Sequence, residues 1–317
     1  MLSGALTERL RSAVSACLQQ HVGPDERVLV ALSGGIDSIC LLDLLSTVLP
    51  ARCLSALHVH HGISPNADGW AQFAEDTCRA RAIAFRCERV VVERGSSDGL
   101  EAAARRARHA VFARAECDWV ALGHHRDDQA ETMLFNLLRG TGLTGAGGMQ
   151  VRSGRLLRPL LGVGRGDIAA YAALHGLTWC EDESNTDTYY SRNFLRHQIF
   201  PRMQERLPAA SQNLAQAAVR FSEACDLLDD LARIDLGMCD NFPFSVLLLQ
   251  ALPEQRGRNL LRYLLALNGV RIPGEMRLRE ALRQLVDAGP DRHPVVVFGS
   301  HQLLRRKGRV YLEPANS

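Results

Sequence analysis

The chain has 317 residues, of which 46% are hydrophobic and 23% are charged. This is the composition of an ordinary globular protein, it excludes an intrinsically disordered chain, and the length predicts about two domains. No apolar run approaches the roughly 20 residues that cross a bilayer. The N-terminus lacks a basic segment followed by an apolar one, so we expect neither a membrane partner nor a secretory signal.

Cysteine usage and charge distribution bear on location and partners. The nine cysteines are scattered, and no two of them form a C-x-x-C pair. This indicates reduced thiols in the cytoplasm rather than a disulfide framework, a zinc site or an iron–sulfur site. The net charge is only +2, but residues 251–317 hold 12 basic side chains against 6 acidic ones. A basic C-terminal segment favours an anionic macromolecular partner, although a solvated basic face would give the same pattern.

Short apolar runs alternate with helix-spaced apolar positions over the first half of the chain. The apolar runs predict buried strands at 27–32, 53–59, 84–92 and 119–122. The helical spacing predicts helices at 3–20, 36–49, 67–83, 101–115 and 128–139. Strands that alternate with helices in this way predict an α/β fold, with a doubly wound parallel sheet and right-handed crossovers.

The second half of the chain is mainly helical in its pattern. Residues 140–155 are rich in glycine, which predicts a mobile loop that either covers a ligand or only connects two elements. The later elements expected are helices at 166–175, 193–231 (interrupted at Pro201 and Pro208), 253–267 and 274–288, and strands at 295–298 and 310–312. We therefore expect a catalytic α/β domain at 1–205. A linker helix and a smaller helical or α+β domain are expected at 206–317.

A glycine-containing turn follows the first predicted strand and leads directly into a helix. Its two glycines let the backbone approach a ligand, and the N–H groups at the helix start attract an anion. Asp37 would repel a bare phosphate, so its presence indicates a Mg²⁺ ion between the carboxylate and the anion. The alternative is a plain strand–turn–helix connection. The predicted nucleotide-binding residues are Ser33, Gly34, Gly35, Ile36, Asp37 and Ser38.

A second polar cluster, Gly123–Thr132, follows the fourth predicted strand and opens a helix. Ligands of parallel sheets bind at the carboxyl ends of the strands. Asp128 and Glu131 are three residues apart on one helix face, where carboxylates can hold Mg²⁺ or accept a proton from an amine. A capping box that only stabilises the helix has the same spacing. We predict Asp128 and Asp37 as the Mg²⁺ ligands.

Five histidines lie next to the second and fourth predicted strands: His58, His60, His61, His124 and His125. Histidines so close together could bind zinc. No cysteine or carboxylate completes a tetrahedral ligand set, so the pattern favours packing and hydrogen bonding around a nucleotide or substrate.

The glycine-containing turn resembles the PP-loop of the N-type ATP pyrophosphatases, which cleave ATP to AMP and pyrophosphate and adenylate a substrate. Further motifs resemble the tRNA(Ile)-lysidine synthetase family over almost the whole chain. They are His124-His125-x-x-Asp128-Gln129-x-Glu131-Thr132, Arg139–Gly142, Ala56–Ile63, Glu101–Arg108, Arg158–Leu161, Asp182–Asn185, Ser191–Pro201, Arg258-x-x-Leu261-Arg262 and Leu303–Arg306.

This resemblance implies a cytoplasmic ligase that uses ATP and Mg²⁺ and acts on isoleucine tRNA with a CAU anticodon. The enzyme would first transfer AMP to the C2 oxygen of the wobble cytidine, and the ε-amine of L-lysine would then attack that carbon. Asp128 or Glu131 is expected to accept or steer the amine proton. Arg192 or Arg196 is expected to hold an adenylate phosphate, with plain surface contacts as the alternative. The resemblance leaves a homodimer open.

The main alternative is another PP-loop adenylating enzyme, either NAD synthetase-like or a tRNA thiolase. A thiolase is expected to have a spaced cysteine pair, and a small-molecule synthetase does not need a basic C-terminal segment. A tRNA-binding protein without activity is the second alternative. Such a protein would not need the Ser33–Ser38 loop together with Asp128 and Glu131.

Overall fold

A computed structural model describes residues 2–93, 99–181, 191–289 and 292–315. The Asp182–Asn185 motif lies outside these residues. The chain forms two compact units: unit 1 comprises Met1–Phe135 with Gly148–Ala218, and unit 2 comprises Asn136–Gly147 with Val219–Ser317. The later division falls inside helix α10 (Ala210–Leu236), near the boundary expected after residue 205, which itself stays a prediction.

Unit 1 is built around a six-stranded sheet with the strand order β3-β2-β1-β4-β6-β5. Five strands run parallel, and β5 pairs antiparallel with β6 at one edge. The strands are β1 (Val28–Ala31), β2 (Leu54–His60), β3 (Ala84–Arg89), β4 (Trp119–Ala121), β5 (Arg152–Ser153) and β6 (Leu156–Leu157). This topology confirms the predicted α/β fold class.

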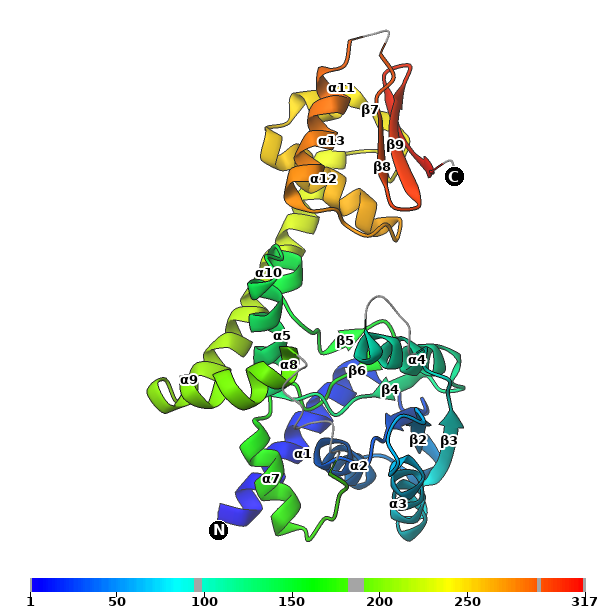
Figure 1. Cartoon of the computed structure of the whole chain (residues 1–317), viewed down its shortest axis with the longest axis vertical. Helices are drawn as coiled ribbons and strands as arrows, with labels where there is room; N and C mark the ends of the chain where they lie inside the picture. Colours follow the sequence, from blue (N-terminus) through cyan, green and yellow to red (C-terminus); the bar gives the residue numbers. More distant parts are fainter. Residues whose placement is uncertain (1, 94–98, 182–190, 290–291, 316–317) are drawn as a thin grey trace. The chain divides into compact units, whose positions relative to one another are not determined.

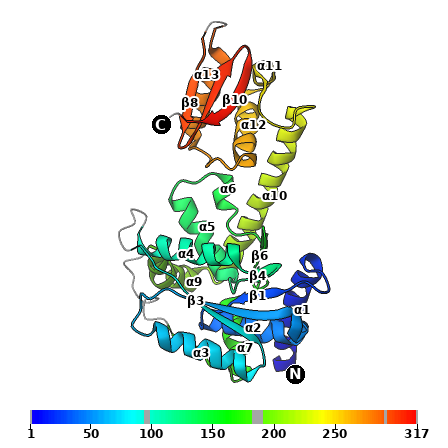
Figure 2. The same ribbon diagram turned by 90° about the vertical axis from the view of Figure 1, so that its right-hand side faces the viewer.

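Helices cover both faces of the sheet in unit 1 (Figure 1, Figure 2). Successive side chains of a strand point to opposite faces, so Val28 and Val30 of β1 enter one core and Leu29 enters the other. The first core also contains residues of α1 (Leu2–His21), α2 (Ile36–Val48), α3 (Ala67–Ala80) and α7 (Arg165–Leu174). The second core contains Val111 and Phe112 of α4 (Leu100–Arg114).

The sheet order places the functional motifs together. From β1 the chain proceeds to β2 and β3 on one side, and β4 then returns to pair with β1 on the other side. Two adjacent parallel strands whose connections leave in opposite directions form a topological switch point, where ligands of open α/β sheets bind. The glycine-containing turn follows β1, and the Gly123–Thr132 cluster follows β4 and opens α5 (Arg126–Leu138).

Several details of the chain differ from the sequence prediction, among them four elements that were not expected, β6, β7 (Phe244–Ser245), α11 (Val246–Ala251) and β9 (His301–Arg306). The glycine-rich segment 140–155 contains the short helix α6 (Leu143–Ala146) and strand β5, so it is only partly a loop. Pro201 does not interrupt the helix, because α8 (Ser191–Phe194), the π-helical turn η3 (Leu195–Ile199) and α9 (Phe200–Arg206) follow without a break. Pro201 lies in the first turn of α9, where its missing N–H is tolerated. The interruption expected at Pro208 is present between α9 and α10.

Unit 2 combines helices with a four-stranded sheet of order β7-β10-β9-β8, whose strand pairs are all antiparallel. The remaining elements of the described residues are η1 (Ala51–Cys53) in unit 1 and, in unit 2, β7 (Phe244–Ser245), α11 (Val246–Ala251), α12 (Glu254–Leu267), α13 (Glu275–Asp287), β8 (Val295–Phe298), β9 (His301–Arg306) and β10 (Arg309–Pro314). Buried leucines of α12 and α13 pack on Phe244, Leu303 and Val310 of the sheet. Across the part of the chain that the structure describes, no helix has the length and apolarity needed to span a membrane.

Arg305 has a structural role in unit 2. Its Nη1 atom donates hydrogen bonds to the carbonyl oxygens of Leu285 and Ala288, at distances of 3.0 and 2.8 Å. These are carbonyl groups at the C-terminal end of α13, where a cation also interacts favourably with the helix dipole. Arg305 therefore caps a helix, and Arg306 pairs with Glu313 at 3.1 Å.

Candidate active site

The glycine-containing turn forms a compact cradle at the start of α2. Gly34 has a φ of +91°, a left-handed conformation that glycine adopts without strain. The hydroxyl of Ser38 donates to the Gly35 carbonyl at 2.9 Å and lies 3.1 Å from the hydroxyl of Ser33. The turn thus presents backbone and hydroxyl donors at a helix N-terminus, which is a favourable place for a phosphate group.

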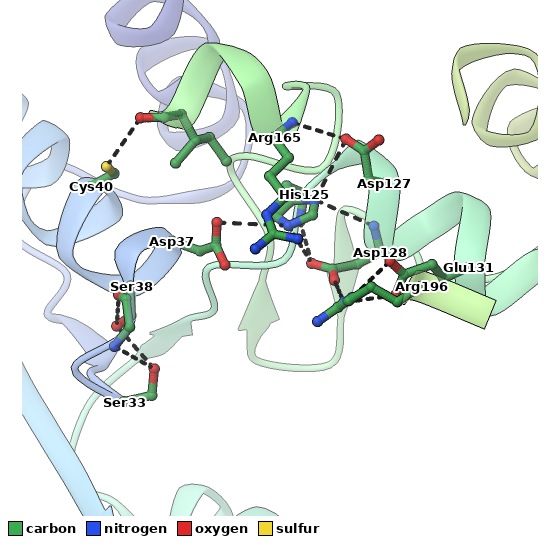
Figure 3. Close-up of polar contacts among 12 residues, drawn as sticks. Ser33, Asp37, Ser38, Cys40, His125, Asp127, Asp128, Glu131, Arg165 and Arg196 are labelled. Atoms are coloured by element: carbon green, nitrogen blue, oxygen red, sulfur yellow. Dashed lines mark hydrogen bonds and ion pairs between the residues drawn. The ribbon is translucent and has the colours of Figure 1, made fainter. Parts of the chain in front are cut away.

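Asp37 lies in the first turn of α2 and faces the polar cluster that follows β4 (Figure 3). Its Oδ1 atom is buried and has no hydrogen-bond partner among the described residues. Burial raises the pKa of the Asp37 carboxyl, and the nearby charge of Asp128 raises it further, against the opposing effect of His125. A cation bound at Oδ1 would relieve this unfavourable environment, so the donor atoms present fit a hard metal ion.

His125 and Asp128 form a capping box at the start of α5. The Oδ2 atom of Asp128 accepts the backbone N–H of His125 at 3.0 Å, and the Nδ1 atom of His125 accepts the backbone N–H of Asp128 at 3.3 Å. This box joins His125 to Asp128, three residues earlier than the pair of Asp128 and Glu131 that the sequence suggested, so Asp128 closes the box instead of opening it. The box does not exclude a further role, because the Nε2 atom of His125 lies 3.4 Å from Asp128 and 3.7 Å from Asp37.

Arg196 joins the two carboxylates of α5 to the π-helical turn (Figure 3). Its guanidinium donates to Oδ1 of Asp128 at 2.6 Å and to both carboxylate oxygens of Glu131 at 2.7 and 2.8 Å. Burial opposes the charge of Arg196, but hydrogen bonds and negative charge from Glu131 and Asp128 raise its pKa above the ordinary value. Burial likewise opposes the charge of Asp128, while His125 and Arg196 hold the pKa of its carboxyl below the ordinary value.

Arg192 and Arg196, between which the sequence could not choose, have different contacts in the structure. Arg192 donates to the hydroxyl of Thr132 at 3.3 Å and lies over the ring of Phe135, at 5.9 Å from its centre. Arg196, one helical turn later, contacts the acidic pair instead. The geometry brings Asp37, His125, Asp128, Glu131 and Arg196 together and places Arg192 beside them.

Sequence reasoning missed Arg165, the first residue of α7. Its backbone N–H donates to Oδ2 of Asp127 at 2.9 Å, and its side chain extends toward Asp37 and His125 (Figure 3). The charge of Arg165 favours the ionised form of Asp37. A signal was available in the sequence, because a basic residue in the first turn of a helix works against the helix dipole.

The histidines of β2 have hydrogen-bond partners within the protein. His58 is buried and its Nδ1 atom lies 2.9 Å from the carbonyl oxygen of Leu32, so this nitrogen carries a proton. His60 contacts Asp68 through Nε2 at 3.2 Å. Among the residues that the structure describes, no three His, Cys, Asp or Glu side chains are grouped as metal ligands would be. Among the same residues, Asp37, whose buried Oδ1 atom lacks a hydrogen-bond partner, stays a predicted cation ligand.

Comparisons with known proteins agree with this geometry. Residues 6–203 match the PP-loop domain family, and residues 244–311 match the TilS substrate binding domain family. Among solved structures, the chain resembles the U34-tRNA thiolase NcsA from Methanococcus maripaludis with a TM-score of 0.57 and 18% identity. That match covers 69% of this chain and 80% of the other chain, and at this identity it indicates the shared fold alone.

Curated relatives match nearly the full length of the chain. A tRNA(Ile)-lysidine synthase from Azoarcus sp. (strain BH72) is 46% identical, over 98% of this chain and 69% of the relative. An enzyme with the same name from Aromatoleum aromaticum is 46% identical over 92% of this chain and 70% of the relative. One from Nitrosomonas europaea is 42% identical over 95% of this chain and 68% of the relative. The chain, with its PP-loop domain followed by a TilS substrate binding domain, belongs to the tRNA(Ile)-lysidine synthase family.

Proposed function

We propose that this protein ligates L-lysine to C2 of the wobble cytidine of isoleucine tRNA with a CAU anticodon and so forms lysidine. ATP is cleaved to AMP and pyrophosphate, and an adenylated tRNA is the intermediate. The observation that carries the proposal is the meeting of the Ser33–Ser38 loop with the group of Asp128, Glu131 and Arg196 at one switch point of the sheet. An NAD synthetase-like enzyme or a tRNA thiolase is not favoured, since the relatives at 42–46% identity are lysidine synthases.

The first step is adenylation of the cytidine. The Ser33–Ser38 loop binds the phosphates of ATP through its backbone N–H groups and hydroxyls. Asp37, with Asp128 opposite, would hold Mg²⁺, and the chemistry that this ion supplies is neutralisation of phosphate charge as pyrophosphate leaves. Arg165 is placed to contact the phosphates from the start of α7. The wobble base must leave its stack to reach this site, as single-stranded bases usually do when proteins read them.

The second step needs a neutral amine, whereas a lysine side chain with a pKa of about 10.4 is protonated at neutral pH. Asp128 is a weak base, because His125 and Arg196 hold its pKa below the ordinary value. It therefore steers the ammonium group by charge. Glu131 lies beside it on the same helix face, and the guanidinium of Arg196 donates to both of its carboxylate oxygens. The two carboxylates orient the amine, and Glu131 takes up its proton as the C–N bond forms and AMP leaves.

Unit 2 supplies a basic surface for the anionic backbone of the tRNA. A groove of about 620 Å³ is lined by Arg305, Lys307 and Arg309 together with polar groups of β7 and α11. Lys307 and Gly308 form the tight turn between β9 and β10, with φ angles of +50° and +72°. Basic side chains on such a turn suit phosphate groups, which position a nucleic acid without reading its sequence. We further propose a cytoplasmic protein; sedimentation of the pure protein distinguishes a monomer from the homodimer that the resemblance leaves open.

The order of the two steps gives the test of the proposed function. Pyrophosphate release should require tRNA but not lysine, because the carbon under attack belongs to cytosine and the lysine amine is the nucleophile. Labelled lysine should then enter isoleucine tRNA with a CAU anticodon, and adenylated tRNA should accumulate when lysine is omitted. Lysine-dependent ATP–pyrophosphate exchange without tRNA would show that the amino acid is activated instead.

Replacing Asp37 by asparagine should reduce adenylation by at least ~100-fold, since the charged ligand that would hold Mg²⁺ at the reacting phosphate is removed. The side chain keeps its shape, so tRNA binding should remain close to that of the unaltered protein. Pyrophosphate release and tRNA filter binding measure the two properties separately. Asp167→Asn is the matched control, because Asp167 on α7 forms a surface ion pair with Arg9 on α1. Full adenylation by the Asp37 variant would contradict the role of this residue.

A further inference from the structure

His124 occupies a central place that the steps above do not use. It lies between the end of β4 and the start of α5, four residues before Asp128. The Nδ1 atom of its ring is 3.2 Å from Nε of Arg158, in the segment after β6. Both residues therefore stand at the carboxyl ends of adjacent parallel strands, where substrates of such sheets bind.

The chemistry of this hydrogen bond fixes the state of the imidazole ring. A guanidinium group has only donors and does not lose its proton in proteins, so Nδ1 of His124 must be the acceptor. A ring that accepts at Nδ1 is neutral and carries its proton on Nε2. We propose that Arg158 is a positioning residue that holds His124 as a neutral Nε2–H donor at the site of the reaction.

Arg158 is itself held firmly enough to do this. The residue is only 6% exposed to solvent. Its Nη1 atom donates to the carbonyl oxygen of Gln150 at 2.6 Å, and its backbone N–H donates to the carbonyl of Val151 at 2.8 Å. A buried arginine bonded in this way has little freedom to turn away from the histidine ring.

Burial and the nearby arginines favour the neutral ring of His124, against the charge of Asp128. Burial is the largest effect and lowers the pKa of His124 to about 3, and the charges of Arg158, Arg108 and Arg105 add to it. Asp128 on α5 is the charged group that opposes them. The ring thus remains neutral at the pH at which the enzyme works, and protonation does not compete with the acceptor role of Nδ1.

A neutral N–H donor has a specific use in a ligase of this kind. It can donate to an anionic oxygen of the substrate without adding a full positive charge beside the attacking amine. It cannot serve as the base for lysine through Nε2, because that nitrogen already carries a proton. This consequence rests on the proposed function, whereas the ring state follows from the hydrogen bond alone.

The ring state can be measured without activity. In protein labelled with ¹⁵N-histidine, long-range ¹H–¹⁵N spectra distinguish a protonated ring nitrogen from an unprotonated one, and His124→Gln assigns the signals. We expect an unprotonated Nδ1 and a protonated Nε2 in the unaltered protein, and a mixture of both tautomers in Arg158→Met. A protonated Nδ1 in the unaltered protein, or an unchanged tautomer in the variant, would overturn the proposal.

Kinetics separate positioning from a loss of folding. Arg158→Met should lower kcat by about 10–100-fold, the usual cost of losing the partner that orients a functional histidine, with KM for ATP and lysine nearly unchanged. Arg158→Lys should recover much of this loss, because an ammonium group also donates to Nδ1. Arg155→Met is the control, since Arg155 donates to the carbonyl of Ala115 and to the sulfur of Cys117 and, within the part of the chain that the structure describes, contacts no histidine ring. Equal losses in both methionine variants, with the tautomer of His124 unchanged, would reduce Arg158 to a structural residue.

Absence of lysidine formation by the unaltered protein would instead contradict the proposed function and would leave the conclusion about the ring state unaffected.

Discussion

Replacing Arg196 by methionine should abolish lysidine formation and lower the free energy of unfolding by about 3 kcal/mol. Removing one partner of a buried ion pair costs roughly 3–5 kcal/mol, and the lower end applies because the Arg196 side chain is 28% exposed. The variant leaves Asp128 and Glu131, with side chains 18% and 10% exposed, without their cation. Urea unfolding and labelled-lysine incorporation measure the two effects.

The loss of stability in this variant should depend on pH. The pKa of Asp128 is depressed in the folded protein, so its ion pair contributes stability above the unfolded pKa and loses it as the pH falls through the folded pKa. The difference between Arg196→Met and the unaltered protein should therefore be largest near neutral pH and shrink below about pH 4. Arg192→Met is the matched control. It removes one hydrogen bond to Thr132 and should cost only about 1 kcal/mol at either pH. Equal and pH-independent losses in both variants would show that Arg196 does not stabilise the acidic pair.

Gly123→Ala should reduce adenylation by about 100-fold, the loss that follows a displacement of about 1 Å in an active site. A Cβ atom on residue 123 would lie 3.0 Å from the carbonyl carbon of Asp37 and 3.1 Å from the backbone nitrogen of Ser38. These are main-chain atoms, which cannot rotate aside as the end of a side chain can. The methyl group would push the start of α2 away from the segment that carries His124 and His125.

A neighbouring glycine provides the comparison for this variant. A Cβ on Gly162 would have no heavy atom within 4 Å, and the residue has no positive φ, so Gly162→Ala should leave pyrophosphate release unchanged. Full adenylation by Gly123→Ala would mean that the two backbones do not need their close approach.

The sequence predicted the α/β fold class because strand and helix periodicities alternate cleanly up to residue 139. It also placed both polar clusters after strands, and parallel strands bring such positions to the same edge. The order of the strands was not predictable from periodicity, since it depends on which strands pair. The meeting of Ser33–Ser38 with Asp128 depends on β1 pairing with β4 rather than only with β2.

The choice between Arg192 and Arg196 needed the structure for a different reason. Residues four positions apart share a face of a regular α-helix, so spacing alone cannot separate them. Both side chains face α5 in the structure, where Arg192 contacts Thr132 and Phe135 and Arg196 contacts the acidic pair one turn earlier in that helix. Arg305 needed the structure as well, because a basic residue in the segment 251–317 gives no sign from spacing that its side chain caps α13.

The arginine fork of Arg196 also has a consequence for how the protein folds. Its contacts join residues that are 65 and 68 positions apart in the chain, across several elements of the sheet. Closing so long a segment costs chain entropy, and the contacts of Arg196 offset this cost only after the ends have met. The pairing of β1 with β4, which joins Val28 to Trp119, closes a longer segment still, and α5 takes its place only once β4 is paired. We therefore expect the sheet to form before Arg196 clamps the acidic pair, so that catalytic competence lags behind the recovery of secondary structure.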